Sequence, residues 1–267
     1  MTRLSGTDAP AQEPRSGGRD PRVARGIDEM RRRVVGAAVV GALVLAPGVS
    51  LIAYPEAGEE KTPAGASPKK RWGLLIDTNK CKPSCNACVT ACSNHNGWEN
   101  EGRRTDPQWI RKVEVTDPKT RVSRSVPVMC QHCSNAPCIE VCPTGASFKR
   151  ADGIVLVDRH ICIGCRMCII ACPFEARFLV SRNLSGQKAN VPRGKGTAEG
   201  CTLCVDRVDE GKVPACVEAC AREGSGAMIF GDLMDPASEI SRALSAWPAA
   251  QLRADLMLDA GVSYQGL

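Results

Sequence analysis

Apolar positions along this chain fall in short runs that cysteine, glycine and proline repeatedly interrupt. The alternating segments predict strands at residues 74–77, 113–115 and 177–180. Helical spacing predicts helices of two or three turns at residues 86–93, 136–141, 166–171 and 214–221. Short elements of both kinds predict an α+β fold of low regularity.

Helical spacing near the C-terminus admits two interpretations. Six bulky residues recur there at helical intervals: Ile240, Leu244, Trp247, Leu252, Leu256 and Leu258. Such a stripe either covers the protein's own core or forms helices that dock a partner. The sequence leaves both interpretations open.

The N-terminal region changes character abruptly. Residues 1–28 are rich in Gly, Pro, Arg and Asp, a composition typical of disorder. Arg31, Arg32 and Arg33 then precede an uncharged apolar run, which resembles a twin-arginine export signal. An uncleaved membrane anchor is the alternative, because residues 34–53 carry no charge. Either interpretation places the folded part on the periplasmic side of the cytoplasmic membrane.

Composition and charge narrow the possibilities further. Aromatic residues make up only 4% of the 267 residues, so we expect cofactors to fill part of the interior. The formal net charge is +6, but part of this excess lies in residues 1–53, where eight arginines face five acidic residues. No long basic run follows, so we expect no nucleic-acid binding.

The strongest pattern is formed by sixteen cysteines in four groups of four. The groups are Cys81-x3-Cys85-x2-Cys88-x3-Cys92, Cys130-x2-Cys133-x4-Cys138-x3-Cys142, Cys162-x2-Cys165-x2-Cys168-x3-Cys172 and Cys201-x2-Cys204-x11-Cys216-x3-Cys220. The third group, followed by Pro173, has the spacing of bacterial ferredoxins. Three cysteines on a tight loop reach one cubane cluster, and the fourth binds the other cluster of a pair. The spacing therefore predicts that all sixteen bind four 4Fe-4S clusters.

Zinc and disulfides are the competing interpretations of these cysteines. Structural zinc sites use two Cys-x2-Cys pairs separated by a longer loop, and only the fourth group fits that description. Eight disulfides would suit an exported chain, but neighbours two residues apart seldom satisfy disulfide geometry. Both alternatives fit the third group poorly.

Crossing ligands imply that the clusters come in pairs. Phe148 and Ile154 flank Asp152-Gly153, a hairpin signal between the second and third groups, so these two groups form one pair. The first and fourth groups form the other pair by elimination. The predicted ligand sets are Cys130, Cys133, Cys138 and Cys172; Cys162, Cys165, Cys168 and Cys142; Cys81, Cys85, Cys88 and Cys220; and Cys201, Cys204, Cys216 and Cys92.

No catalytic constellation is visible in the sequence. None of the three histidines follows a Cys-x-x-Cys haem motif. His132, between two predicted ligands, either tunes a cluster or faces solvent or a backbone carbonyl; His95 and His160 are expected to be structural. We therefore expect an electron-transfer component that is not an enzyme by itself.

Residues 71–246 resemble the four-cluster ferredoxin-like subunits of bacterial and archaeal membrane oxidoreductases. The resemblance rests on Val126-Pro-Val-Met-Cys-Gln-His-Cys, Ala171-Cys-Pro-Phe-Glu-Ala-Arg, Pro214-Ala-Cys-Val-Glu-Ala-Cys and Phe230-Gly-Asp-Leu. Within that family, Cys81-Lys-Pro-Ser-Cys85 and Ala91-Cys-Ser-Asn-His-Asn resemble DsrO, a subunit of a sulfur-metabolism membrane complex.

The resemblance implies two pseudo-symmetric ferredoxin-like modules and two partners. One partner is an integral membrane subunit that interacts with quinone, and the other is a haem-bearing periplasmic subunit. Membrane association then occurs by docking or through an uncleaved anchor. The alternative assignment is the electron-transfer subunit of a molybdopterin oxidoreductase of the polysulfide, thiosulfate or tetrathionate reductase type, and a redox-silent zinc adaptor is a third.

The expected organisation has four parts. An export signal or anchor occupies residues 1–53, and a Pro- and Gly-rich linker follows at residues 54–71. The four-cluster domain spans residues 72–246, and residues 247–267 form a C-terminal tail.

Overall fold

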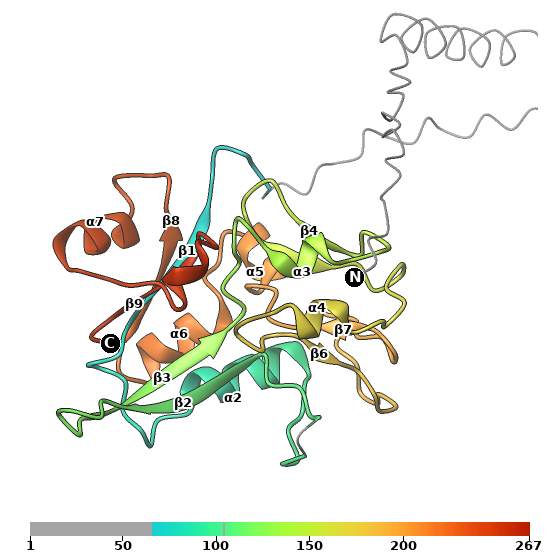
Figure 1. The fold of residues 1–267 in the computed structure, drawn as a ribbon, viewed down its shortest axis with the longest axis horizontal. Coiled ribbons are helices and arrows are strands. Elements are labelled where there is room, and N and C mark those ends of the chain that lie inside the picture. Colours follow the sequence, from blue (N-terminus) through green and yellow to red (C-terminus); the bar gives the residue numbers. More distant parts are fainter. Residues whose placement is uncertain (1–65, 104) are drawn as a thin grey trace, which may run out of the picture. The chain divides into compact units, whose positions relative to one another are not determined.

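Residues 66–103 and 105–267 are described by a computed structural model of the protein (Figure 1). The predicted export signal or anchor lies outside the described residues, as does most of the predicted linker. Within the described ranges, no helix combines the length and hydropathy that a membrane crossing needs.

A three-stranded sheet in the order β8-β1-β9 brings the two ends of the described chain together. Strand β1 (Trp72–Asp77) lies in the middle, with β8 (Met228–Asp232) antiparallel and β9 (Val262–Gln265) parallel to it. Leu74, Leu75 and Ile76 are each at most 1% exposed. Both faces of β1 are therefore buried, which explains its continuous apolar run.

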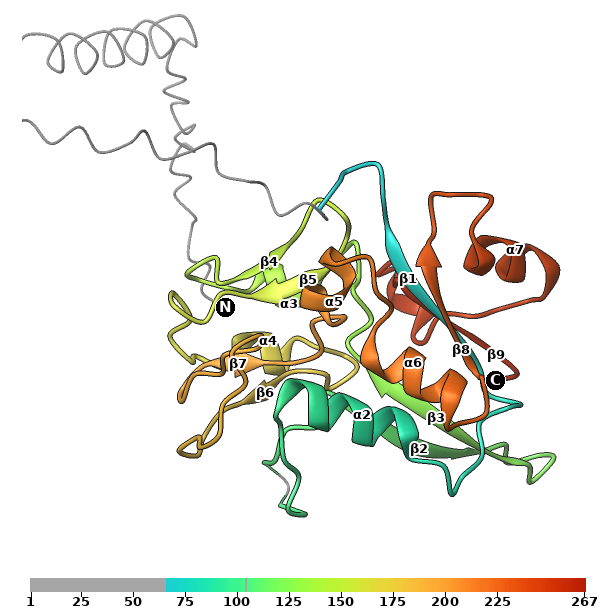
Figure 2. The same cartoon turned by 180° about the vertical axis from the view of Figure 1, so that it is seen from behind.

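Two helices pack beside this sheet and each carries two of the cysteines. Helix α2 (Ala87–Asn96) ends at Gly97, whose left-handed φ of 67° lets its N–H donate to the Ser93 carbonyl. Helix α6 (Ala215–Arg222) begins after Pro214 and lies alongside α2 (Figure 2). A short helix α5 (Val205–Asp209) precedes it. The helices predicted at residues 86–93 and 214–221 are confirmed.

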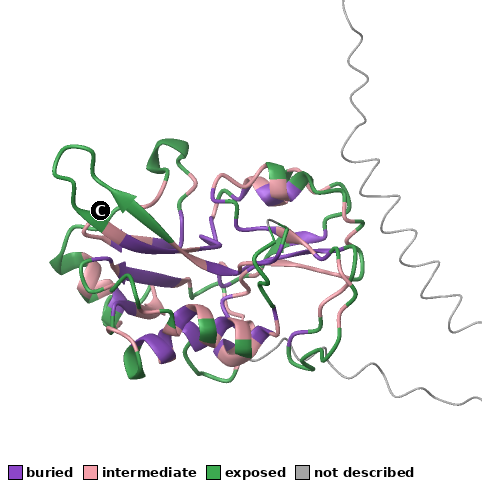
Figure 3. Ribbon diagram, turned by 90° about the horizontal axis from the view of Figure 1, so that it is seen from below, coloured by how far each residue is buried: buried purple, intermediate pink, exposed green. Residues whose placement is uncertain are grey.

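A long antiparallel ribbon lies beside α2 at the lower left of the molecule in Figure 1. It consists of β2 (Ile110–Thr116) and β3 (Ser123–Met129), paired along their whole length. Its base is buried through Ile110 and Met129, whereas Val115 towards the turn is 46% exposed. Figure 3 shows the same change from buried to exposed along the ribbon. The predicted strand at residues 113–115 lies inside β2.

The remaining elements form the second half of the fold. Helices α3 (Pro137–Glu140) and α4 (Met167–Ile170) pack on each other, each only one turn long and shorter than the sequence predicts. Strands β4 (Ser147–Lys149) and β5 (Val155–Val157) form the predicted hairpin. Strands β6 (Phe178–Leu179) and β7 (Ala198–Glu199) form a second short pair. The predicted α+β class is confirmed.

The C-terminal stripe belongs to the core only in part. Ile240 in α7 (Glu239–Ala246) is fully buried, and it packs where any side chain at Gly231 of β8 would collide with it. A 3-10 turn η1 (Ala254–Leu256) follows. The buried apolar residues form two groups, one around β1 and one around β5, and Leu252 packs against both. Trp247, in contrast, is 68% exposed.

The segment expected as a tail contributes a strand to the central sheet. Residues 247–267 include β9, whose Val262 and Tyr264 are each 1% exposed. Four residues give too short an alternation to stand out in a sequence. The described residues form one compact unit that includes this strand.

Candidate metal centres

All sixteen cysteines lie in the described residues, and all are free thiols. Nine are buried, six are partly exposed, and Cys165 is the exposed one. A free cysteine can be buried as a small apolar residue, so it is the grouping of these thiols that indicates a site.

Thiols from distant parts of the sequence converge on four places, which we call sets I to IV. Three sets line voids in the protein. Set II consists of Cys92, Cys201, Cys204 and Cys216; set III of Cys130, Cys133, Cys138 and Cys172; and set IV of Cys142, Cys162, Cys165 and Cys168. Each void is lined by four thiols and mainly apolar atoms, which suits a compact metal-sulfur core.

Set I is identified by the mutual effects of its thiols. It consists of Cys81, Cys85, Cys88 and Cys220. Burial, followed by the charges of Cys220 and Cys81, raises the pKa of Cys88 to about 12. The thiols of sets II, III and IV line the voids together as the crossed pairing predicts, and the grouping of set I is consistent with it. That these thiols bind clusters stays a prediction.

One helical turn produces each crossing. On α2, Cys88 belongs to set I and Cys92 to set II; on α6, Cys220 belongs to set I and Cys216 to set II. Positions four apart lie on one face of a helix and about 6 Å apart along its axis. The same spacing separates Cys138 from Cys142 and Cys168 from Cys172 around α3 and α4.

The four sets form a chain in the order I, II, III, IV. Sets I and II adjoin through Cys88 and Cys216, and the charge of each neighbour raises thiol pKa values. Sets II and III adjoin at Cys201, which packs against the buried residues around both sets, and the charge of Cys130 contributes to raising its pKa. Sets III and IV adjoin through Cys138 and Cys168. This order could not be read from the residues, because it depends on how the two halves of the fold pack.

Desolvation makes the most buried of these thiols poor acids without a metal. Burial raises the pKa of Cys92 and of Cys133 to about 12 each, and that of Cys130 to about 11. A bound metal reverses this effect, because its charge deprotonates a coordinating thiol. Sixteen thiol donors arranged four to a site fit four 4Fe-4S clusters.

Hydrogen-bond donors point at several sulfurs. The backbone N–H groups of Ala227 and Leu203 donate to Cys220 and Cys201 across 3.2 and 3.4 Å. Those of Ser147, Ala176 and Ala198 donate to Cys142, Cys172 and Cys162 across 3.4, 3.5 and 3.3 Å. Such donors stabilise the negative charge of a thiolate-bound cluster.

Side chains add donors that the sequence did not single out. The Asn96 amide and the Trp98 indole each donate to the Cys92 sulfur across 3.4 Å. The Lys112 ammonium donates to the carbonyls of Lys82, Pro83 and Cys85 across 2.6, 3.0 and 2.6 Å. Lys112 therefore fastens the first cysteine loop, which has one residue more than the third group's spacing. Asn96 and Trp98 reach Cys92 locally, from four and six residues along the chain, whereas Lys112 reaches its loop from β2 through a tertiary contact.

Backbone strain concentrates at the cysteine loops. His132, Arg166, Leu203 and Cys204 have positive φ values of 44°, 66°, 55° and 49°. Gly164 also has a positive φ, and a Cβ there would collide with the Gly196 carbonyl. Non-glycine residues adopt this conformation only where the surroundings enforce it, and functional sites are where it clusters.

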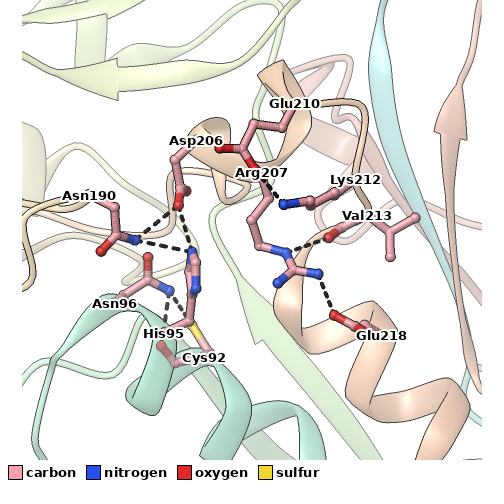
Figure 4. Close-up of polar contacts among 10 residues, drawn as sticks. All are labelled: Cys92, His95, Asn96, Asn190, Asp206, Arg207, Glu210, Lys212, Val213 and Glu218. Atoms are coloured by element: carbon pink, nitrogen blue, oxygen red, sulfur yellow. Dashed lines mark hydrogen bonds and ion pairs between the residues drawn. The ribbon is translucent and has the colours of Figure 1, made fainter.

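The histidines do not face the sites as ligands. His132 is buried, with its Nδ1 accepting from the Val155 N–H across 3.0 Å, so the expectation that it faces solvent or a carbonyl was wrong. Burial lowers its pKa to about 3. His95 hydrogen-bonds Asp206 across 2.9 Å and Asn190 lies beside both, which ties α2 to α5 (Figure 4). His160 is exposed.

Comparison with known protein families and curated proteins also indicates iron-sulfur binding. A domain family described as "4Fe-4S dicluster domain" matches residues 122–233, which contain the second, third and fourth cysteine groups. The first group precedes the matched segment.

Three curated proteins illustrate the relatives. The "Hdr-like menaquinol oxidoreductase iron-sulfur subunit 1" of Archaeoglobus fulgidus is 41% identical over 266 residues, covering 88% of this chain and 96% of that protein. A tetrathionate reductase subunit of Salmonella typhimurium is 39% identical, covering 75% of this chain and 74% of that protein. A sulfite dehydrogenase subunit of Allochromatium vinosum is 40% identical, covering 64% and 72%.

Proposed function

Because this chain belongs to the family of iron-sulfur subunits of oxidoreductases that carry a 4Fe-4S dicluster domain, we propose that it relays electrons through four 4Fe-4S clusters. The sixteen cysteines of sets I to IV are the proposed ligands. The observation that carries the proposal is the convergence of these thiols into four crossed sets of four.

Bound clusters would supply one-electron chemistry that needs no acid or base from the protein. The chain's own contribution is to space the sets, to bury them, and to aim N–H donors at their sulfurs. The linear order of the sets suits a relay between one redox partner near set I and another near set IV. The chain is then an electron-transfer component, and catalysis resides in other subunits.

The proposed complex is of the Dsr type, with a membrane subunit that interacts with quinone and a haem-bearing periplasmic subunit. The similarity to a menaquinol oxidoreductase subunit supports this assignment, since it covers 88% of this chain and 96% of the relative. The similarity to a tetrathionate reductase subunit favours the second candidate, the electron-transfer subunit of a molybdopterin oxidoreductase. It covers 75% of this chain.

The proposed location is the periplasmic side of the cytoplasmic membrane, reached by twin-arginine export. The support is the sequence Arg31-Arg32-Arg33 and the uncharged run after it, both outside the described residues. Replacing all three arginines by lysine should retain the folded protein in the cytoplasm, with unchanged expression as the control. Normal export of that variant would contradict the proposed route.

The test of function is anaerobic purification of the full chain from its membrane. We expect about sixteen irons per chain, EPR signals of several interacting reduced clusters, and co-purification with a quinone-interacting membrane subunit and a multihaem cytochrome. Recovery of a molybdopterin protein instead would select the second candidate. Stoichiometric zinc without EPR signals would overturn both.

A further inference from the structure

Arg177 places a positive charge in the protein interior beside two of the thiol sets. The residue follows Cys172-Pro173-Phe174-Glu175-Ala176 and leads into β6. It is 4% exposed. Among residues 66–103 and 105–267, no carboxylate forms an ion pair with it. A buried charge without a carboxylate is costly unless something else of opposite charge compensates it.

The thiols provide that compensation. Arg177 Nη2 lies 3.8 Å from the Cys138 sulfur. Burial is the largest influence on its pKa, yet the charges of Cys130, Cys138 and Cys168 raise the pKa overall. The guanidinium therefore faces set III, whose void it lines beside Cys138, and its charge also influences Cys168 of set IV. Its alkyl chain lies against Gly200, where an added Cβ would be 3.4 Å from Arg177 Cδ.

Within the part of the chain that the structure describes, no comparable buried cation serves set II. Burial and neighbouring thiols raise the pKa values of Cys201 and Cys216 well above the usual range. In that set, Arg207 influences Cys204, but its guanidinium bonds Val213 and Glu218 at the surface side of α5 (Figure 4). Set III therefore has a buried cation beside it. Set II, which adjoins set III near Cys201 and Cys130, has none among the described residues.

We propose that Arg177 raises the reduction potential of the cluster held by set III, and to a smaller extent that of set IV, above that of set II. The physical reason is that reduction adds one negative charge, which a fixed cation in a low-dielectric interior stabilises. An electron at set II then moves downhill to set III. Arg177 therefore acts through its charge, and it biases electron transfer from set II towards set III.

Arginine suits this role better than lysine. Its guanidinium stays charged at all accessible pH values, and it offers several N–H donors in a fixed plane. The potential of set III is therefore decoupled from proton uptake at the cation. A lysine would keep the charge but lose the planar donor arrangement.

The inference rests on the proposed function, and potentiometric EPR of the purified full chain separates the two. The variants are Arg177→Met, which removes the charge, and Arg177→Lys, which retains it. Arg242→Met, on the exposed surface of α7, is the matched control for loss of one positive charge. Iron is measured in every preparation.

We expect two of four redox transitions to shift to lower potential in Arg177→Met, one further than the other. Arg177→Lys should shift them less, and Arg242→Met should shift none. Four loaded clusters with unchanged transitions in Arg177→Met, or an equal shift of all four, would overturn the inference while leaving the proposed function intact. Absence of clusters from the wild-type chain would instead overturn the proposed function.

If Arg177→Met loses one cluster, the Arg177→Lys variant decides whether Arg177 acts by its charge or by packing. If Arg177→Lys loads four clusters and the potentials of the same two transitions stay near their wild-type values, the charge effect is supported. A lysine variant that also loses the cluster shows that Arg177 acts by packing, which overturns the inference.

Discussion

The indole Nε1 of Trp98 lies 3.4 Å from the sulfur of Cys92, and both side chains are buried. Cys92 lies on the second turn of α2, and Trp98 follows the end of this helix. The chain turns back after α2, so the indole N–H reaches the Cys92 sulfur. The hydrogen bond counters the effect of burial on the pKa of Cys92. It is a contact to set II.

Replacing Trp98 by Phe should lower the potential of the set II cluster. The variant removes a donor to a sulfur whose negative charge grows on reduction, at a cost of about 0.5–1 kcal/mol. For one electron this is about 20–40 mV. Potentiometric EPR measures the shift. Trp109→Phe is the matched control, because Trp109 is fully buried but its Nε1 has no partner in the described structure.

The Trp98 variant also tests the assignment of transitions. The transition that moves in Trp98→Phe must differ from the two that move in Arg177→Met, because Cys92 and Cys138 belong to different sets. Movement of the same transition in both variants would contradict the division into sets II and III.

Replacing Cys142 by Ser should remove the cluster of set IV and leave that of set III in place. Cys142 is the last cysteine of the second group in sequence, yet it lines the void with Cys162, Cys165 and Cys168. Iron analysis should show a loss of up to four irons, and EPR the loss of one cluster's signal. Loss of the set III signal, with set IV intact, would refute the crossing.

Replacing Lys112 by Met should loosen the first cysteine loop. The variant removes three hydrogen bonds from Nζ to backbone carbonyls, two of them at 2.6 Å, and we expect a destabilisation of about 1–2 kcal/mol. Anaerobic iron release to a chelator should be faster, with set I lost first. Lys119→Met, at the exposed turn of the ribbon, should leave the rate unchanged.

Replacing Tyr264 by Phe should weaken the attachment of β9. The hydroxyl donates to the Pro127 carbonyl across 3.0 Å and accepts from Gln131 across 3.2 Å, and the residue is 1% exposed. Leaving these buried groups unpaired costs about 1–3 kcal/mol. Heat inactivation, followed by loss of EPR signal, should occur at lower temperature. Ser263→Ala, on the same strand, is the control. An unchanged midpoint would show that the hydroxyl does not anchor β9.

Much of the site was predictable because it depends on the spacing of cysteines that are close together in the sequence. Cys88 and Cys92, like Cys216 and Cys220, are four residues apart on a helix, so their assignment to adjoining sets follows from helical rise. The hairpin between the second and third groups was equally local, since Asp152-Gly153 lies in its turn. Helices α3 and α4 are shorter than predicted, since helix ends are the part of a helix that local spacing fixes least.

The sequence by itself determined the number of thiols, their grouping and their crossing, because each depends on spacing within a few residues. Only the tertiary structure decided that β9 completes the central sheet, that the sets follow one another from I to IV, and that Arg177 faces Cys138. These features join residues far apart in the chain, and their energies come from burial and long-range packing. Spacing along the sequence carries no record of either.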